Sequence, residues 1–168
     1  MDLTYFVDKM RQNAKTIETA FSCLTEEEIY WHPQPEKWSL LDIICHLYDE
    51  EHLDFRVRID YTLFRPREQW PAIDPEGWVT AHNYAEKSLE IMLKNFLEER
   101  EKSIVWLEKL QQADWHCAHV HPQFGEIKAG DLLSAWLAHD YLHLRQIMNT
   151  KLSYLRAKAL PYSLRYAE

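Results

Sequence analysis

Hydrophobic residues recur at three- and four-residue steps in four long stretches of the chain, the period of an α-helix with one buried face. These stretches cover residues 2–24, about 40–63, about 80–110 and about 131–150. Asp2 and Asp131 are placed to cap the first and last of them. The pattern predicts an all-α fold, a four-helix bundle in which each helix buries one stripe.

The second and fourth helices carry ionisable residues inside their apolar stripes. The second helix has the stripe Ile43, His46, Glu50, Leu53 and Val57, and the fourth has Leu132, Trp136, His139, His143 and Gln146. Burying an ionisable group among aliphatic side chains costs several kcal/mol unless the group is satisfied. A metal ion would satisfy His46 directly, and Glu50 directly or through a neighbouring group. A hydrogen bond between His46 and Glu50, one helical turn apart, is the alternative.

His139 and His143 are four residues apart, so both project from one face of a helix. Two imidazoles at this spacing can bind one metal ion, as in the metalloprotease motif H-E-x-x-H. Here Asp140 occupies the position of the motif's Glu, which excludes the protease motif. A buried, hydrogen-bonded histidine pair is the alternative interpretation.

Two segments between the helices have the composition of ordered connections. Residues 65–78 hold three prolines, one glycine and two tryptophans, which is typical of an ordered loop that either walls a pocket or forms a structural lid. Residues 114–128 hold His116, His119 and His121 but run into Pro122 and Gly125, which predicts an extended loop or short hairpin. Alternation along a strand would put His119 and His121 on one face and His116 on the other, so this segment favours the mouth of a pocket over a metal site.

Composition agrees with one helical domain over residues 1–168. Only 3 glycines are present, and no phosphate-binding glycine loop occurs. The formal charge of −8 disfavours nucleic acid and anionic membranes as partners. The charged run 98–102 is predicted to be the solvated side of the third helix.

The chain has features of a cytoplasmic protein. Its first residues lack the basic and apolar regions of a signal peptide, and no apolar run is long enough to cross a bilayer. The three cysteines, Cys23, Cys45 and Cys117, are widely spaced, which is expected for reduced thiols. Each is predicted to be a small buried apolar residue.

Three motifs in this order resemble the DinB-like metal-binding four-helix bundles, a family that includes bacillithiol- and mycothiol-dependent S-transferases. They are the segments 38–47 (WSLLDIICHL), 121–127 (HPQFGEI) and 139–147 (HDYLHLRQI). The resemblance covers nearly the whole chain and implies that His46, His139 and His143 are metal ligands. The chain departs from many relatives at Leu142, where they have a further histidine, and from some at Arg145, where they have a small residue; neither position belongs to the triad.

Three imidazoles leave coordination positions open, as in catalytic metal sites. Zn²⁺ is the default ion, with Ni²⁺ next and Fe²⁺ or Mn²⁺ also compatible with imidazole. The ion could activate water or hold a thiol as thiolate. These features predict a metal-dependent thiol S-transferase or hydrolase acting on a small molecule, with a low-molecular-weight thiol as one candidate substrate. Glu50 is the candidate general base, or a group that orients His46.

Two other functions are compatible with the sequence. The bundle could bind a metal or small ligand without turnover, or it could be a metal-free dimerisation module. Homodimerisation is compatible with every interpretation, through apolar surface on the first helix or in the tail beyond residue 150.

Overall fold

The computed structural model describes residues 1–167. In chain order its elements are α1 (Leu3–Ala20), α2 (Glu26–Ile29), α3 (Leu40–Asp49), the π-helix η1 (Glu50–Phe55), α4 (Arg56–Phe64), α5 (Trp78–Ala81), the 3₁₀-helix η2 (Tyr84–Glu86), α6 (Leu89–Glu108), β1 (Ala118–His121), β2 (Gly125–Lys128) and α7 (Ala129–Lys158).

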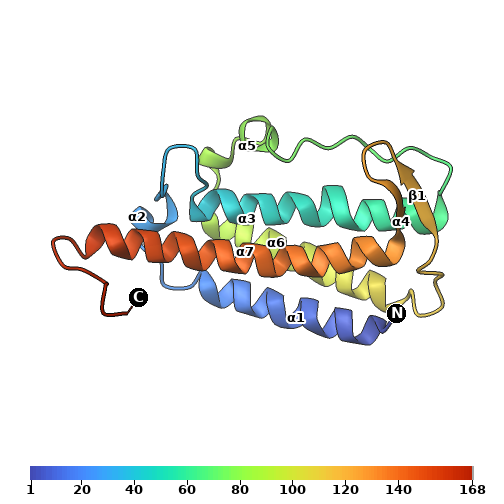
Figure 1. Cartoon of the computed structure of the whole chain (residues 1–168), viewed down its shortest axis with the longest axis horizontal. Helices are drawn as coiled ribbons and strands as arrows, with labels where there is room; N and C mark the ends of the chain where they lie inside the picture. The colour runs from blue at the N-terminus through green and yellow to red at the C-terminus, as the bar shows by residue number, and fades with distance from the viewer. Residues whose placement is uncertain (168) are drawn as a thin grey trace.

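The long helices form the expected four-helix bundle. α1 and α7 run in one direction, whereas the continuous rod α3–η1–α4 and α6 run in the other (Figure 1). α1 packs against α6 and α7, and α3 also packs against α6 and α7. Because the rod and α6 are parallel, the chain between them, residues 65–88, returns along the length of the bundle over its outer side (Figure 1).

A layer of buried polar residues divides the core into two apolar clusters. One cluster contains residues near the start of α3 and the end of α1, and the other lies around the start of α7 and the end of α6. Each long helix crosses from one cluster to the other through buried polar positions, which are Asn13, His46, Glu50, Glu51, Asp54, Arg100, Ser103, Asp140 and His143. The ionisable residues in the apolar stripes therefore lie at one level of the bundle.

Side-chain caps begin several helices where the sequence predicts them. Asp2 accepts a hydrogen bond from Tyr5 N at 3.1 Å at the start of α1. Ser39 and Asp42 form a reciprocal capping box at the start of α3. Asp131 plays a different part from the predicted one: α7 already begins at Ala129, and the Asp131 carboxylate accepts from Lys128 N at 3.0 Å.

The second long helix contains a π-helical segment, Glu50–Phe55, inside the stretch predicted as regular helix. A π-helical turn holds more residues than an α-turn, so it shifts which side chains face a neighbour. Here it allows two adjacent carboxylates, Glu50 and Glu51, both to be buried, at 5% and 1% exposure.

The third predicted helix is wrong over its first residues. Instead of a helix from residue 80, the chain forms α5 and η2, and α6 begins only at Leu89. Asn83 adopts φ 51°, which an α-helix cannot contain, and Ser88 caps α6 by accepting from Ile91 N. Ala85, inside the predicted helix, is exposed.

Further side-chain expectations are corrected by the packing. Arg100, placed in the solvated run 98–102, is 1% exposed. Among the cysteines only Cys45 is buried, because Cys23 lies at an exposed turn with φ 56° and Cys117 is half-buried.

The predicted short hairpin before the last helix is confirmed. β1 and β2 pair antiparallel with His121 opposite Gly125, and Gly125 adopts φ 70°, a conformation that favours glycine. α7 continues beyond its predicted end near Thr150 to Lys158. The tail packs back only in part: Tyr154 contacts the ring of Trp31, while Leu155, Leu160 and Tyr162 are exposed.

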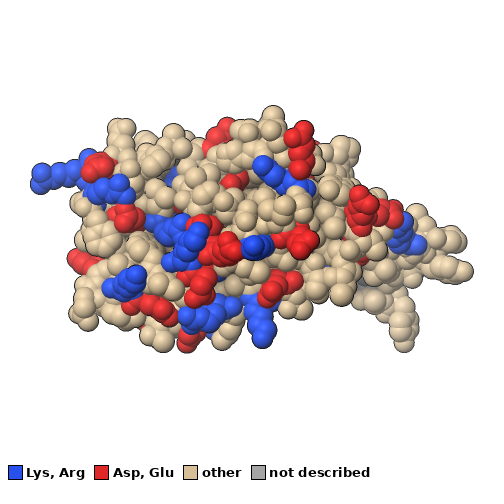
Figure 2. Space-filling view, turned by 180° about the vertical axis from the view of Figure 1, so that it is seen from behind, with Lys and Arg blue, Asp and Glu red and all other residues tan. Residues whose placement is uncertain are grey.

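The surface carries charges of both signs. On the face shown in Figure 2, lysine and arginine side chains are interspersed with aspartate and glutamate. Within residues 1–167, no helix combines the length and the apolar character needed to cross a membrane.

Candidate metal centre

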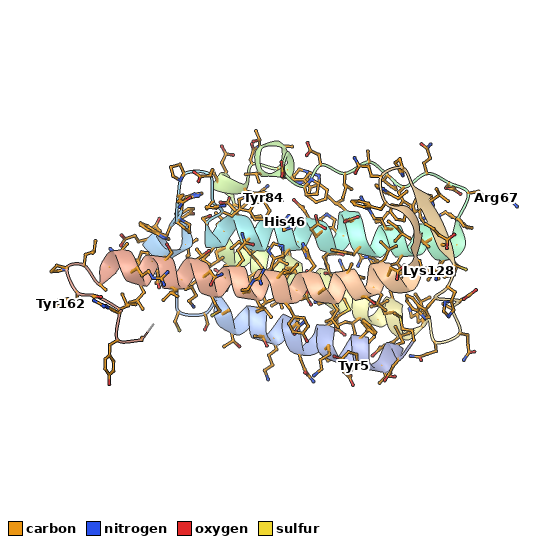
Figure 3. All side chains as sticks on the ribbon, in the orientation of Figure 1. Tyr5, His46, Arg67, Tyr84, Lys128 and Tyr162 are labelled. Carbon is orange, nitrogen blue, oxygen red and sulfur yellow. The ribbon has the colours of Figure 1, made fainter. Side chains whose placement is uncertain are left out.

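Three histidines from two helices converge within the polar layer. His46 projects from α3, and His139 and His143 project from α7, one turn apart; His46 lies near the middle of the bundle (Figure 3). His139 Nε2 is 3.3 Å from His46 Nε2 and 3.0 Å from His143 Nε2. Among the described residues, these three form the one group of histidine, cysteine or carboxylate side chains close enough to share an ion.

Hydrogen bonds alone do not account for this convergence. The Nε2 atom of a neutral imidazole carries either one hydrogen or one lone pair. His139 Nε2 contacts both other Nε2 atoms, so it can form a full hydrogen bond with only one of them. A cation can accept a lone pair from all three. Tetrahedral Zn²⁺ with nitrogen ligands at about 2.0–2.1 Å keeps those nitrogens roughly 3.3 Å apart, which matches the two distances from His139, and all three ligand atoms lie within 4.8 Å of one another.

Burial keeps the three imidazoles neutral, the form that binds metal. Desolvation, with the neighbouring His143, lowers the pKa of His46 to about 3. Desolvation and the charges of His143, His46 and Arg100 lower the pKa of His139 to about 2. Burial also lowers the pKa of His143, against the opposing effects of Gln146 and Asp140.

Aromatic rings enclose the triad on two sides. The Trp38 ring lies 4.6 Å from the ring of His46 and is parallel to that of His143. The Phe55 ring lies 5.2 Å from that of His139. A cavity of about 490 Å³ opens beside Trp38 and is also lined by Gln146, one turn beyond His143. None of the triad histidines lines this cavity, which lies next to the centre on the far side of the Trp38 ring.

Glu50 lies beside the triad without hydrogen-bonding to it. Its Oε1 is 4.0 Å from His46 Nε2, so the direct His46–Glu50 hydrogen bond considered from the sequence is not formed. Burial first, and then the charge and hydrogen bond of Asp54, raise the pKa of Glu50 to about 8. Burial and the neighbouring Asp54 therefore both favour the protonated form of Glu50. The Nδ1 atom of His46 is buried without a partner among the described residues, so no outer group orients this ring through that atom.

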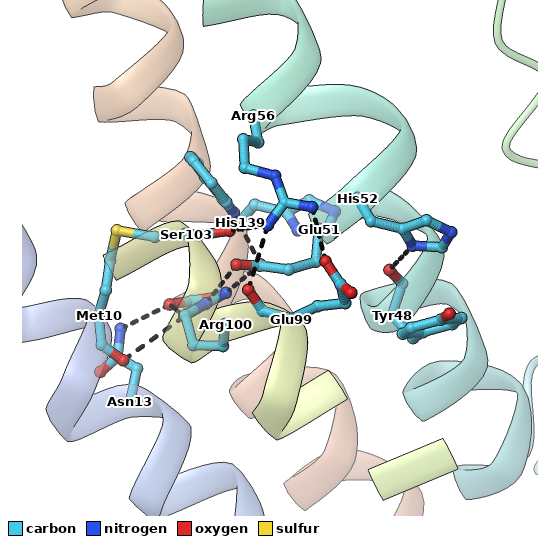
Figure 4. Close-up of polar contacts among 12 residues, drawn as sticks. Met10, Asn13, Tyr48, Glu51, His52, Arg56, Glu99, Arg100, Ser103 and His139 are labelled. Carbon is cyan, nitrogen blue, oxygen red and sulfur yellow. Dashed lines mark hydrogen bonds and ion pairs between the residues drawn. The ribbon is translucent and has the colours of Figure 1, made fainter. Parts of the chain in front are cut away.

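A buried ion network that the sequence analysis missed lies next to His139. Arg100 bonds both carboxylate oxygens of Glu51 (2.8 and 2.9 Å) and both of Asp140 (2.7 Å each), part of which is drawn in Figure 4. Asn13 donates to Asp140, and Trp136 donates to Glu51. The network joins α1, η1, α6 and α7 beside a triad histidine. One feature of the sequence points to this network: Asp140 is a carboxylate that lies between the inward-facing residues His139 and His143.

The hairpin histidines do not join the triad. His116 is exposed, whereas His119 and His121 share one face of β1 and lie against the ring of Trp70. This agrees with the predicted alternation and with a pocket-lining role. Arg145, which could have added a charge near the site, is exposed.

The comparisons with known proteins agree with this architecture. A sequence model described as the DinB superfamily matches residues 9–147. Among solved structures, YfiT from Bacillus subtilis superposes with a TM-score of 0.78 at 14% identity, covering 88% of this chain and 85% of that chain. YfiT is described as a probable metal-dependent hydrolase with an unusual four-helix bundle topology. No curated protein sequence matches the chain.

Proposed function

This chain belongs to the DinB superfamily, and from that premise we propose that it is a metal-dependent enzyme that acts on a small molecule at the centre formed by His46, His139 and His143. The observation that carries the proposal is the convergence of three neutral Nε2 atoms, 3.0 and 3.3 Å apart, beside a cavity. Three protein ligands leave a position for water or substrate, which is typical of catalytic zinc sites. We propose Zn²⁺ or Ni²⁺ as the ion, since imidazole suits both.

The residues around the centre suit hydrolysis or thiol transfer. A divalent ion held by these imidazoles would lower the pKa of a bound water or thiol. Glu50, with its Oε1 4.0 Å from His46 Nε2, is the group placed to accept the released proton. Its raised pKa suits a proton acceptor only once a nearby positive charge favours the carboxylate, so its protonation is coupled to ion binding.

Hydrolysis is the first candidate, because the structurally similar YfiT is described as a probable metal-dependent hydrolase. Thiol transfer is the second, and it rests on the resemblance of the three sequence motifs to bacillithiol- and mycothiol-dependent transferases. The wall formed by Trp38 suits either kind of substrate, since it offers an apolar surface next to the histidines.

The first test is metal content. The variant His139→Ala/His143→Ala should lose bound metal, because one imidazole cannot retain it, and His116→Ala should retain it because His116 lies exposed on the hairpin. Elemental analysis after identical purification measures both. Equal metal in the two variants would refute the proposed site.

The second test separates the activities. Wild-type protein is assayed against ester and amide panels, and for thiol transfer to chlorodinitrobenzene, before and after chelation and metal restoration. Activity that follows the metal, and that Glu50→Gln reduces about 10²-fold or more without loss of metal, supports the proposal. Metal binding with no turnover in either assay would favour the non-catalytic alternative.

A further inference from the structure

A second cavity, which we call the hairpin cavity, lies at the end of the bundle that carries β1 and β2. Its volume is about 530 Å³, and it is walled by residues 69–73 of the long connection, residues 119–123 of the hairpin and Arg58 of α4. None of the triad histidines lines it. The tryptophan-containing loop and the histidine-containing hairpin both line this cavity. The proposed metal chemistry uses neither segment.

Arg58 contacts two neighbouring side chains at the cavity wall. Its Nε forms an ion pair with Asp54, one turn earlier on the rod. Its guanidinium carbon lies 4.9 Å from the centre of the Trp70 ring, a cation–π contact. Neither terminal nitrogen of Arg58 has a hydrogen-bond partner within residues 1–167. The ion pair therefore involves only the Nε edge of the guanidinium, and both terminal amino groups remain available to a ligand.

The other polar groups of the cavity are hydrogen-bond donors or can become donors. His121 Nδ1 accepts from the backbone N–H groups of Gln123 and Phe124, so a neutral His121 ring carries its hydrogen on Nε2. Gln69 and Gln123 add amide groups to the wall. No aspartate or glutamate lines the cavity, although the whole chain has a formal charge of −8. This local chemistry favours a ligand with negatively charged oxygens.

The apolar part of the wall includes the aromatic ring of Trp70. The Trp70 ring stacks on His119 with centroids 4.5 Å apart, and Pro71 and Ile73 also line the cavity. A planar carboxylate matches the two free amino groups of an arginine fork, and a flat body attached to it would lie along these residues.

We propose that the hairpin cavity is a binding site for an organic carboxylate, with Arg58 holding the carboxylate group and Trp70, Pro71 and Ile73 contacting the flat body of the ligand. The site is separate from the metal centre. Both sites lie along the rod α3–η1–α4. Asp54, which forms the ion pair with Arg58, also interacts with Glu50 beside His46.

The test uses benzoate as the probe and metal-stripped protein, because an anion can also bind a metal ion. Titration is followed by NMR of the tryptophan indole N–H signals, with the Trp70 signal assigned from Trp70→Phe. We expect saturable shifts with benzoate, none with the neutral benzamide, and the same affinity in His139→Ala/His143→Ala. Equal binding of benzamide, or benzoate binding that disappears in the triad variant, would overturn the proposal.

Substitution of Arg58 provides the second arm. Arg58→Met should weaken benzoate binding about tenfold or more, because a charge-assisted bidentate contact is lost. Arg58→Met/Asp54→Asn removes both partners of the ion pair and should show the same loss, which covers the case in which the single variant does not fold. Arg67→Met, on an exposed residue at the outer end of the same connection, serves as the control (Figure 3).

Two further outcomes would overturn the proposal. Unchanged binding in both Arg58 variants would mean that Arg58 has a purely structural role and would overturn the site. Binding of inorganic phosphate in place of benzoate would overturn the assignment to carboxylates.

Discussion

Each triad imidazole is neutral for a reason found in its own surroundings. His46 and His139 are removed from water by Trp38 and Phe55, and each lies beside another imidazole whose protonation would repel a second charge. Arg100 adds a fixed positive charge that acts on His139. This arrangement lowers the stability of the metal-free protein, because without an ion the converging lone pairs of the buried imidazoles are not all satisfied.

The metal-free protein should lose stability as the pH falls below about 6.5. In the unfolded chain His46 has its ordinary pKa near 6.5, whereas in the folded chain its pKa is about 3. Between these values the unfolded state binds a proton that the folded state does not, so the free energy of unfolding decreases as pH falls. Denaturant unfolding with chelator present, from pH 7 to pH 4, measures this decrease.

Substitution isolates the contribution of each imidazole. In His46→Gln the pH dependence should be less steep by about one proton, or about 1.4 kcal/mol per pH unit, and by more in His46→Gln/His139→Gln. If both variants follow the wild-type slope, the histidines are not responsible for it.

At the scale of elements, the π-helical segment serves two neighbours at once. Glu50 lies beside His46, and the adjacent Glu51 pairs with Arg100 on α6. In a regular helix adjacent residues point about 100° apart, so the wider turn helps one rod contact both the triad and the ion network. The network then fixes α7 at Asp140, the residue next to His139.

Arg100→Met should destabilise the protein strongly. It leaves Glu51 and Asp140 buried without their cation, and breaking a buried ion pair in this way costs about 3–5 kcal/mol. The matched control is Arg11→Met, which removes a half-exposed ion pair with Glu108 and should cost about 1 kcal/mol or less. Urea unfolding of both variants measures the change in the free energy of unfolding. A similar, small decrease in each would show that the ion network contributes little to stability.

At the scale of the whole molecule, the polar layer joins helices that enter it from opposite directions. The triad connects the rod to α7, and the ion network connects α1, η1, α6 and α7 at the same level. An ion bound by the triad would bind the folded chain alone, because His46 and His139 are 93 residues apart in sequence.

Metal binding should therefore raise the melting temperature. At a free ion concentration of 100 times Kd the stabilisation is about 2.7 kcal/mol, which for a chain of this size corresponds to roughly 5–10 °C. Thermal unfolding with Zn²⁺ or Ni²⁺, compared with chelator, measures the shift. The increase should be absent in His139→Ala/His143→Ala and present in His116→Ala; an equal increase in both would place the ion elsewhere.

Periodicity along the chain was sufficient to predict four long helices, apart from the first residues of the third, and to place His139 and His143 on one face; the family resemblance was needed to add His46 to them. These features depend on local spacing, which determines the face on which a side chain lies. Spacing does not determine which partner that face meets. The sequence pattern therefore predicts a solvated Arg100, whereas in the structure Glu51 and Asp140, 49 and 40 residues away, enclose it.

The other features decided by tertiary structure have the same cause. The π-helical turn packs against α6 and α7, and the break at Asn83 comes directly before the buried Tyr84, so both departures from a regular helix coincide with tertiary contacts. The hairpin cavity exists because residues 69–73 and 119–123, separated by the whole of α6, meet at one end of the rod. The sequence by itself determined the chemistry available to the centre, and the tertiary structure decided which groups share it.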